Sequence, residues 1–288
     1  MHQPQCGFRQ IGQGRSAVVY LDKPADGRAV VHKVFETSGA AKLVHYVLSG
    51  APNPYGWNPH AIGAAVARRE ILSVLVPFWF HGKLRLPQLH GAGWNDARRS
   101  NELRIEFIDG THVPLRSQNS ASRHDPIDDL TGNIMRPLRR HLIESGFDGL
   151  VWQAGLGNPV AGGNFMIENG TGRHRKWVWV DLESGVPALF PINPLTLIGF
   201  YLPRSVHHGR PLFDDVDIPK LRRYLAGNHD TIEASLGAES ATALQRSVAE
   251  LDMHQAAWKS MTRVERGIAY FQAMGRITEA ESQWYREH

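Results

Sequence analysis

The sequence contains a single cysteine, Cys6, among its 288 residues. One cysteine cannot form an intrachain disulfide, nor can it supply a cluster of thiolate ligands to a metal. Long apolar runs are also missing, because the most apolar stretch, residues 71–80, contains Pro77 and has about half the length that spans a bilayer. The first ten residues have neither a basic start nor an apolar core. We therefore expect no membrane span, no signal peptide and a cytoplasmic location.

The sequence also has no strong excess of charge of either sign. The 32 Lys and Arg residues only slightly outnumber the 28 Asp and Glu residues, and the net charge is +4. This mild excess suits an anionic ligand, but no dense basic tract of the kind found in dedicated nucleic-acid binders occurs. The 42% apolar content is that of an ordinary globular protein. Nucleic acid is therefore not an expected partner.

The pattern of elements changes along the chain. Strand-like segments dominate up to Lys33, and later strands are predicted at 84–89, 103–108, 165–167 and 177–180. Helices are predicted at 40–48, at 61–76, at 127–145 with Gly146 as C-cap, and from the Thr278–Glu281 capping box onward. These patterns predict an α+β, bilobal protein with a β-rich N-lobe, 1–109, and an α-rich C-lobe, 110–288.

Residues 51–59 interrupt the predicted N-lobe. Three prolines in this stretch remove backbone donors and disfavour regular structure. We interpret the segment as a loop insertion. Because variable loops often carry recognition, we expect it, together with the C-terminal helices, to carry specificity for an acceptor or partner.

The most informative stretch runs from Ile11 to Tyr20 and contains Gly12 and Gly14. Two glycines one residue apart let the backbone turn tightly and approach a phosphate with no Cβ in the way. The alternation after them predicts a strand, and residues 30–35 predict its antiparallel neighbour. Lys33 lies on that neighbour with Val31 and Phe35 on its own face, which favours a partly buried lysine. Such a lysine can act as a point charge over bound phosphates.

Two oxygen-bearing side chains flank the predicted strand pair of residues 165–180. Asn164 precedes its first strand, and Asp181 follows its second, apolar strand. Antiparallel pairing would bring the two to the same end of the hairpin. The two side chains would then offer an amide oxygen and a carboxylate close together.

Taken in order, these features resemble the protein-kinase-like superfamily, in the diverged bacterial form of small-molecule and lipopolysaccharide kinases, over about residues 8–200. The resemblance implies ATP and Mg²⁺ as cofactors and an unidentified protein or small molecule as acceptor. It implies that the phosphate loop consists of Gly12, Gly14, Ser16 and Val19, with Ala17 in place of the third glycine, and that Lys33, paired with Glu70, binds the phosphates. It further implies that Glu106 and Ile108 form the hinge that binds adenine. Asn164 and Asp181 would hold the metal, and Lys33 and Asp181 would take part in catalysis.

The resemblance fails at the position of the catalytic aspartate. Counting back five residues from Asn164 reaches Pro159, and no carboxylate occurs between Val151 and Gly163. Three interpretations stay open: an atypical phosphotransferase, a pseudokinase that binds nucleotide as a scaffold or regulator, or a nucleotidyl transferase. In the first, Asn158 or Gln153 could orient the acceptor, or the more distant Asp148 could supply a carboxylate.

Two of the carboxylates have local alternatives. Glu70 follows Arg68 and Arg69, so pairing with these neighbours competes with pairing to Lys33. Glu183, beside Asp181, is either a third metal oxygen or the partner of an arginine. The second alternative is favoured.

Overall fold

The computed structural model describes residues 8–14, 16–24, 27–36, 39–113, 126–155, 159–170, 175–183, 195, 198–199, 202–203, 210 and 212–288. The chain forms two compact units. The first consists of residues 1–67, 88–107 and 250–288, and the second of residues 68–87 and 108–249. These units differ from the predicted lobes, because residues 68–87 group with the second unit and residues 250–288 group with the first.

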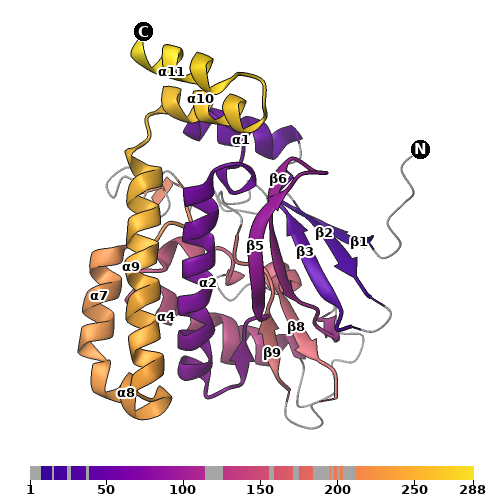
Figure 1. The fold of residues 1–288 in the computed structure, drawn as a ribbon. Coiled ribbons are helices and arrows are strands. Elements are labelled where there is room, and N and C mark those ends of the chain that lie inside the picture. The colour runs from indigo at the N-terminus through magenta and orange to yellow at the C-terminus, as the bar shows by residue number, and fades with distance from the viewer. Residues whose placement is uncertain are drawn as a thin grey trace. The chain divides into compact units, whose positions relative to one another are not determined.

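The first unit contains a five-stranded antiparallel sheet in the order β1-β2-β3-β6-β5 (Figure 1). Its strands are β1 (Phe8–Gln13), β2 (Val18–Asp22), β3 (Val30–Val34), β5 (Leu89–Asn95) and β6 (Ser100–Glu106). The predicted pairing of the strand after the glycines with residues 30–35 is therefore confirmed. Val18, Tyr20 and Val34 form a buried cluster on one face of this sheet.

The predicted strand 84–89 is wrong as a single element. The structure divides it into β4 (Leu84–Arg85), in the second unit, and the start of β5, in the first. Pro87 lies at the break, where it has no backbone N–H to continue a ladder.

The helices of the first unit are built around an aromatic cluster. They are α1 (Gly39–Ser49), α10 (Arg263–Ala273), α11 (Glu279–Glu287), the start of α2 (Pro59–Phe80) and the end of α9 (Ala238–Ser260). The Trp57 ring lies 6.2 Å from that of Trp258 and 5.8 Å from that of Tyr270, and the Arg266 guanidinium lies 4.4 Å from the Trp258 ring centroid. These contacts explain why the C-terminal helices group with N-terminal residues.

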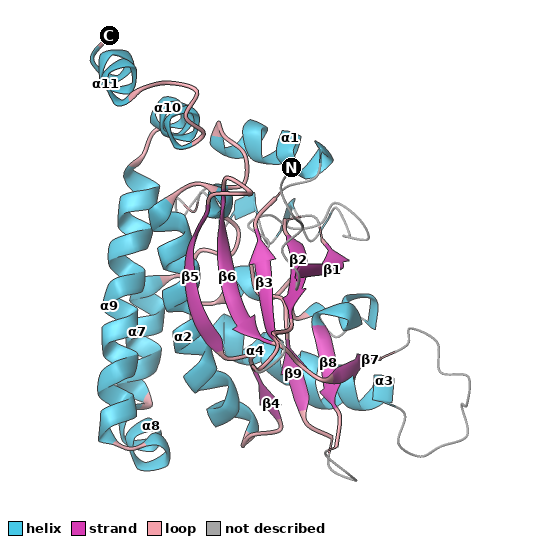
Figure 2. Ribbon diagram, turned by 45° about the vertical axis from the view of Figure 1, so that its right-hand side comes forward, coloured by secondary structure: helices cyan, strands magenta, loops and turns pink. Residues whose placement is uncertain are grey.

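The second unit contains a four-stranded sheet in the order β4-β9-β8-β7 (Figure 2). Its other strands are β7 (Gly110–His112), β8 (Phe165–Glu168) and β9 (Trp177–Trp179). The pairing of β8 with β9 is antiparallel, which confirms the hairpin predicted there. The Trp177 indole N–H donates to Asp129 at 3.0 Å and thereby ties β9 to the neighbouring helix.

The amphipathic helix predicted at 127–145 is present as three consecutive segments: α3 (Pro126–Asp128), a π-helical segment (Asp129–Met135) and α4 (Arg136–Glu144). Gly146 ends it with a φ of +88°, as expected of a glycine C-cap. Helices α7 (Ile218–Gly227) and α8 (His229–Leu236) follow, so the predicted fold class, with a β-rich N-terminal and a helical C-terminal region, is confirmed. In the described part of the chain, no helix has the length and apolar character needed to cross a membrane.

Candidate functional site

The glycine-rich hairpin, Lys33 and their cross-strand neighbours form a row across the first sheet. Gly12 of β1 lies opposite Val19 of β2, and Val19 lies opposite Lys33 of β3. Directly opposed residues of antiparallel strands share a face, so Val19 and Lys33 present their side chains together. The hairpin is closed by the Gly14 N–H, which donates to the Ala17 carbonyl at 2.8 Å.

The local structure would tolerate a side-chain Cβ at either glycine. A Cβ at Gly12 would lie 3.7 Å from the Val19 Cβ, and one at Gly14 would lie 3.5 Å from the Ala17 carbonyl oxygen, both ordinary contacts. Neither glycine has a positive φ. Since the described residues do not require glycine here, the pattern fits a strand to which a ligand makes a close approach.

Lys33 is buried, with 7% of its surface exposed. Its Nζ lies 5.7 Å from the centroid of the Phe35 ring, and its opposite neighbour on β6, Leu103, is fully buried. Lysine is rarely this deep in a protein, because the ammonium loses most of its hydration. The predicted burial of Lys33 is therefore confirmed. A lysine in such a buried position usually has a specific structural or binding role.

The segment 51–59 packs against this hairpin. The Asn53 side chain donates to the Ser16 carbonyl at 3.4 Å and accepts from the Tyr55 N–H at 3.2 Å. Tyr55 is fully buried, with its ring 5.4 Å from that of Phe35. A Cβ at Gly56 would lie 2.6 Å from the Phe35 carbonyl oxygen, so only glycine fits. The segment therefore supports the hairpin, and its role in specificity for an acceptor or partner stays a prediction.

We expect Asn53→Ala to lower the free energy of unfolding by about 1–2 kcal/mol, because it removes two hydrogen bonds of the buried segment. Urea denaturation measures the change. Asn53→Asp keeps the acceptor for the Tyr55 N–H but buries a carboxylate against the Ser16 carbonyl, so its loss should be at least as large. Equal stability of Asn53→Ala and the wild type would contradict this role.

The predicted hinge lies where the chain leaves the first unit. The crossing to the second unit falls between Phe107 and Ile108. The Glu106 N–H donates to the Gln88 carbonyl at 2.8 Å, and its carboxylate accepts from the Gln88 N–H at 3.0 Å. Within the described residues, no backbone hydrogen bond engages Ile108, which is buried. Adenine binding by these residues stays a prediction.

Asn164 and Asp181 lie at the same end of the β8–β9 hairpin. The Asn164 carbonyl accepts from the Val180 N–H at 2.9 Å, one residue before Asp181. The Asn164 side-chain nitrogen donates to the carbonyl and to the side-chain oxygen of Gln153, at 2.8 and 3.1 Å. These bonds orient the amide and leave its oxygen as an acceptor. One carboxylate and one amide oxygen are a donor set that fits Mg²⁺.

The residues proposed to replace the catalytic aspartate have different environments. Pro159 begins a 3₁₀ turn that ends at Asn164. Asp148 is buried and pairs with Arg210 at 3.0 Å, so its carboxylate is already neutralised. Gln153 is 2% exposed, and its Nε2 has no hydrogen-bond partner among the described residues. Asn158 lies outside the described residues. Gln153 is thus a buried donor next to Asn164, whereas Asp148 is engaged elsewhere.

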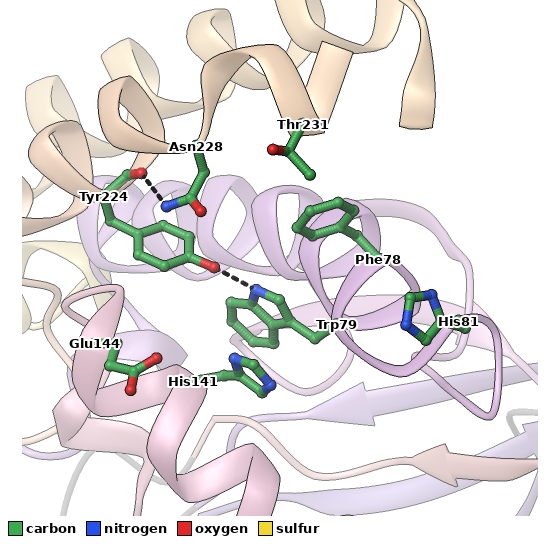
Figure 3. Close-up of a pocket in the computed structure, with 8 residues that line it drawn as sticks. All are labelled: Phe78, Trp79, His81, His141, Glu144, Tyr224, Asn228 and Thr231. Atoms are coloured by element: carbon green, nitrogen blue, oxygen red, sulfur yellow. Dashed lines mark hydrogen bonds between the residues drawn. The ribbon is translucent and has the colours of Figure 1, made fainter. Parts of the chain in front are cut away.

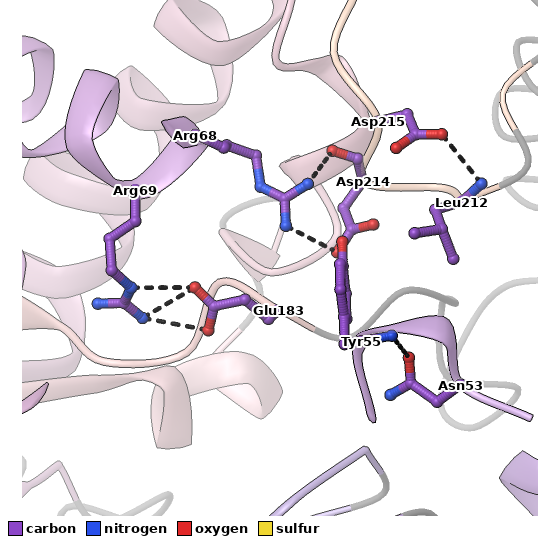
Figure 4. Close-up of polar contacts among 8 residues, drawn as sticks. All are labelled: Asn53, Tyr55, Arg68, Arg69, Glu183, Leu212, Asp214 and Asp215. Atoms are coloured by element: carbon purple, nitrogen blue, oxygen red, sulfur yellow. Dashed lines mark hydrogen bonds and ion pairs between the residues drawn. The ribbon is translucent and has the colours of Figure 1, made fainter. Parts of the chain in front are cut away.

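Two buried arginines on α2 anchor segments far away in the sequence (Figure 4). Arg69 makes a bidentate pair with Glu183, with Nε–Oε1 at 3.0 Å and Nη2–Oε2 at 3.1 Å. Arg68 donates to the Asp214 carbonyl at 2.8 Å and reaches its carboxylate at 3.4 Å. The prediction that Glu183 pairs with an arginine is confirmed. This pair holds the Asp181–Glu183 segment on α2.

Glu70 has a partner that the sequence did not suggest. Its carboxylate accepts a hydrogen bond from the Ser247 hydroxyl at 3.0 Å. The alternative of pairing with Arg68 or Arg69 is wrong, because those arginines pair with Asp214 and Glu183. Lys33 belongs to the first unit and Glu70 to the second, and their pairing stays a prediction.

The comparisons with known proteins give distant likenesses only. No family model matches the sequence. No curated protein matches it either. Among solved structures, the kinase domain of maize sucrose-induced receptor kinase 1, bound to AMP-PNP, is similar with a TM-score of 0.39 and 12% identity, over 94% of this chain and 93% of that one. The Mycobacterium tuberculosis PknI kinase domain is similar with a TM-score of 0.36 and 16% identity, over 94% of this chain and 96% of that one. Likenesses this distant assign the chain to no family.

Proposed function

We propose that this chain is a kinase-like protein that binds ATP with Mg²⁺ and acts as an atypical phosphotransferase. The observation that carries the proposal is the row of Gly12, Val19 and Lys33 across three strands, with Lys33 buried. A glycine-rich hairpin followed by a lysine on the third strand is the phosphate-binding arrangement of protein kinases. The nearly fixed ammonium of Lys33 would bind the α and β phosphates.

The second unit would supply the metal ligands. The Asp181 carboxylate and the Asn164 amide oxygen would hold Mg²⁺, which when bound neutralises charge on the phosphates. The Arg69–Glu183 pair would fix the backbone on which Asp181 lies. Gln153 would hold the Asn164 amide in place and offer its unpaired Nε2 as a donor to the reacting group.

Neither Pro159 nor Asp148 is suited to accept the acceptor's proton. Pro159 has no acid–base chemistry, and Asp148 is bound to Arg210. Phosphoryl transfer depends mainly on positioning and on charge neutralisation, so it can tolerate a weak or missing base. These same observations favour the second candidate function, a pseudokinase that binds nucleotide as a scaffold. Mass spectrometry of the protein and a lysate after incubation with ATP separates the two, since only the transferase adds a phosphoryl or nucleotidyl mass.

Thermal unfolding with and without Mg-ATP tests the binding proposal. A ligand at one hundred times its dissociation constant stabilises the folded state by about 2.7 kcal/mol, which corresponds to a rise in Tm of about 4–5 °C. No rise in the wild type would contradict nucleotide binding.

Asp181→Ala should remove the Mg²⁺ dependence of that rise, because the remaining amide oxygen of Asn164 is a weak ligand alone. The measurement is the Tm with ATP in Mg²⁺ and in EDTA. Asp128→Ala, which removes a carboxylate from α3, is the matched control and should keep the dependence. Full Mg²⁺ dependence in Asp181→Ala would refute the metal assignment.

A further inference from the structure

The second unit contains a cavity of about 580 Å³ whose lining comes from the end of α2 and from α4, α7 and α8 (Figure 3). The volume lies in the range of pockets that enclose small organic molecules. Its lining combines aromatic rings with hydrogen-bonding groups: Phe78, Trp79, His81, His141, Glu144, Tyr224, Asn228 and Thr231. None of these residues belongs to the nucleotide site proposed above.

The aromatic part of the lining is held in place by contacts within the protein. The Trp79 indole N–H donates to the Tyr224 hydroxyl oxygen at 2.9 Å. The Trp79 ring stacks on His141 with centroids 5.1 Å apart and an interplanar angle of 8°. The Tyr224 ring meets Trp79 edge-on, at 6.4 Å and 80°. The rings are therefore ordered before any ligand arrives, which lowers the entropic cost of binding.

The polar part of the lining offers mainly hydrogen-bond acceptors. Glu144 is exposed, and its carboxylate makes no hydrogen bond or ion pair with any described residue. The Asn228 side-chain nitrogen donates to the Tyr224 carbonyl at 2.7 Å, which leaves its amide oxygen free to accept. Figure 3 shows Glu144 beside Tyr224 and His141, on the same side of the pocket as the stacked rings.

No cation in the lining offsets the Glu144 charge. The eight lining residues include neither Lys nor Arg. Burial, together with the charge of the nearby Arg140, lowers the pKa of His141 despite the opposing effect of Glu144, so its imidazole is mainly neutral at pH 7. Burial raises the pKa of Tyr224, so its hydroxyl keeps its proton. The stacked rings are thus mainly neutral, and the Glu144 carboxylate beside them has no ion-pair partner in the described part of the chain.

We propose that this pocket binds a small organic cation with an apolar body, an alkyl or aryl ammonium. Aromatic faces attract a desolvated ammonium, and a carboxylate adds direct charge complementarity. The oxygen atoms of Asn228 and Thr231 accept hydrogen bonds from its N–H groups, while Phe78 and Trp79 contact its carbon skeleton. An anionic ligand would instead be repelled by the unpaired carboxylate.

The test compares 2-phenylethylammonium with 2-phenylethanol, which has a similar apolar body but no charge. Binding is followed by NMR through the indole N–H resonance of Trp79 at pH 7. We expect the ammonium to bind about tenfold more tightly than the alcohol. Glu144→Gln should abolish that preference, and Glu239→Gln, an exposed carboxylate at the start of α9, should retain it.

Three outcomes would overturn the proposal: equal affinity for the alcohol and the ammonium, an undiminished preference in Glu144→Gln, or no saturable binding of the ammonium. Because Glu144 is exposed and unpaired, the variant should fold as the wild type does. The proposal does not depend on nucleotide binding, so either one can fail alone.

Discussion

Replacing Arg69 with alanine will lower the free energy of unfolding by about 3–5 kcal/mol. Arg69 and Glu183 are each about 1% exposed, and the two side chains form a bidentate pair. Removing Arg69 deprives the buried Glu183 carboxylate of its bidentate cationic partner, whereas the cost of burying that charge remains. Urea denaturation followed by circular dichroism measures the loss.

Two further variants make this prediction specific. The double substitution Arg69→Met with Glu183→Met removes both charges and should regain most of the lost stability, because well-packed apolar residues can replace a buried pair. Arg98→Ala removes an exposed pair with Glu36 at 3.9 Å and a contact of the guanidinium with the Tyr20 ring at 4.6 Å, and it should cost only about 1 kcal/mol. A loss as small for Arg69→Ala as for Arg98→Ala would show that the buried pair is not an anchor.

Lys33→Met should weaken ATP binding by about 10- to 100-fold, because the ammonium makes charge-assisted contacts with phosphate oxygens. Methionine is unbranched and apolar, so it suits the buried position between Leu103 and Phe35 without requiring a partner for a charge. Equilibrium dialysis with ATP measures the dissociation constant.

Lys42→Met is the matched control, because Lys42 is an exposed lysine on α1 of the same unit. It should bind ATP as the wild type does. Denaturation of Lys33→Met in parallel establishes that the variant is folded. Wild-type affinity in a folded Lys33→Met variant would remove Lys33 from the phosphate site.

Local patterns made much of the fold predictable. Alternation of side chains at Val18–Asp22 and Val30–Val34 predicted two paired strands, which the structure contains. Gly146 predicted the end of a helix, and its φ is positive in the structure. Both hydrogen bonds of the predicted Thr278–Glu281 capping box are present at the start of α11: each side chain accepts from the backbone N–H of the other residue. Each signal is contained within a few residues, where backbone preference and hydrogen bonding act together.

Contacts across long sequence separations were not predictable. Arg69 and Glu183 lie 114 residues apart, and no local pattern links them. The C-terminal helices join the first unit because Trp258 and Tyr270 pack on Trp57. Strand β5 was not predicted, because Gly91 and Gly93 have no side chains and so interrupt the alternation of apolar and polar residues. Its stability comes from antiparallel pairing with β6.

For the candidate site, the residue types and their order predict roles for Gly12, Lys33, Asn164 and Asp181, and these roles stay predictions. The strand register aligns Gly12 with Lys33 through Val19. It did not indicate that Asn53 supports the hairpin or that Gln153 binds Asn164. Both contacts involve backbone carbonyls, whose positions depend on the completed fold.

Isothermal titration of the wild-type protein with Mg-ATP and with adenosine tests phosphate binding by the glycine-rich hairpin and Lys33. If the row of Gly12, Val19 and Lys33 binds phosphates, Mg-ATP will bind saturably at one site, and adenosine will bind at least about tenfold more weakly. Absence of Mg-ATP binding, or equal affinity for adenosine, would contradict a phosphate-binding role for this row.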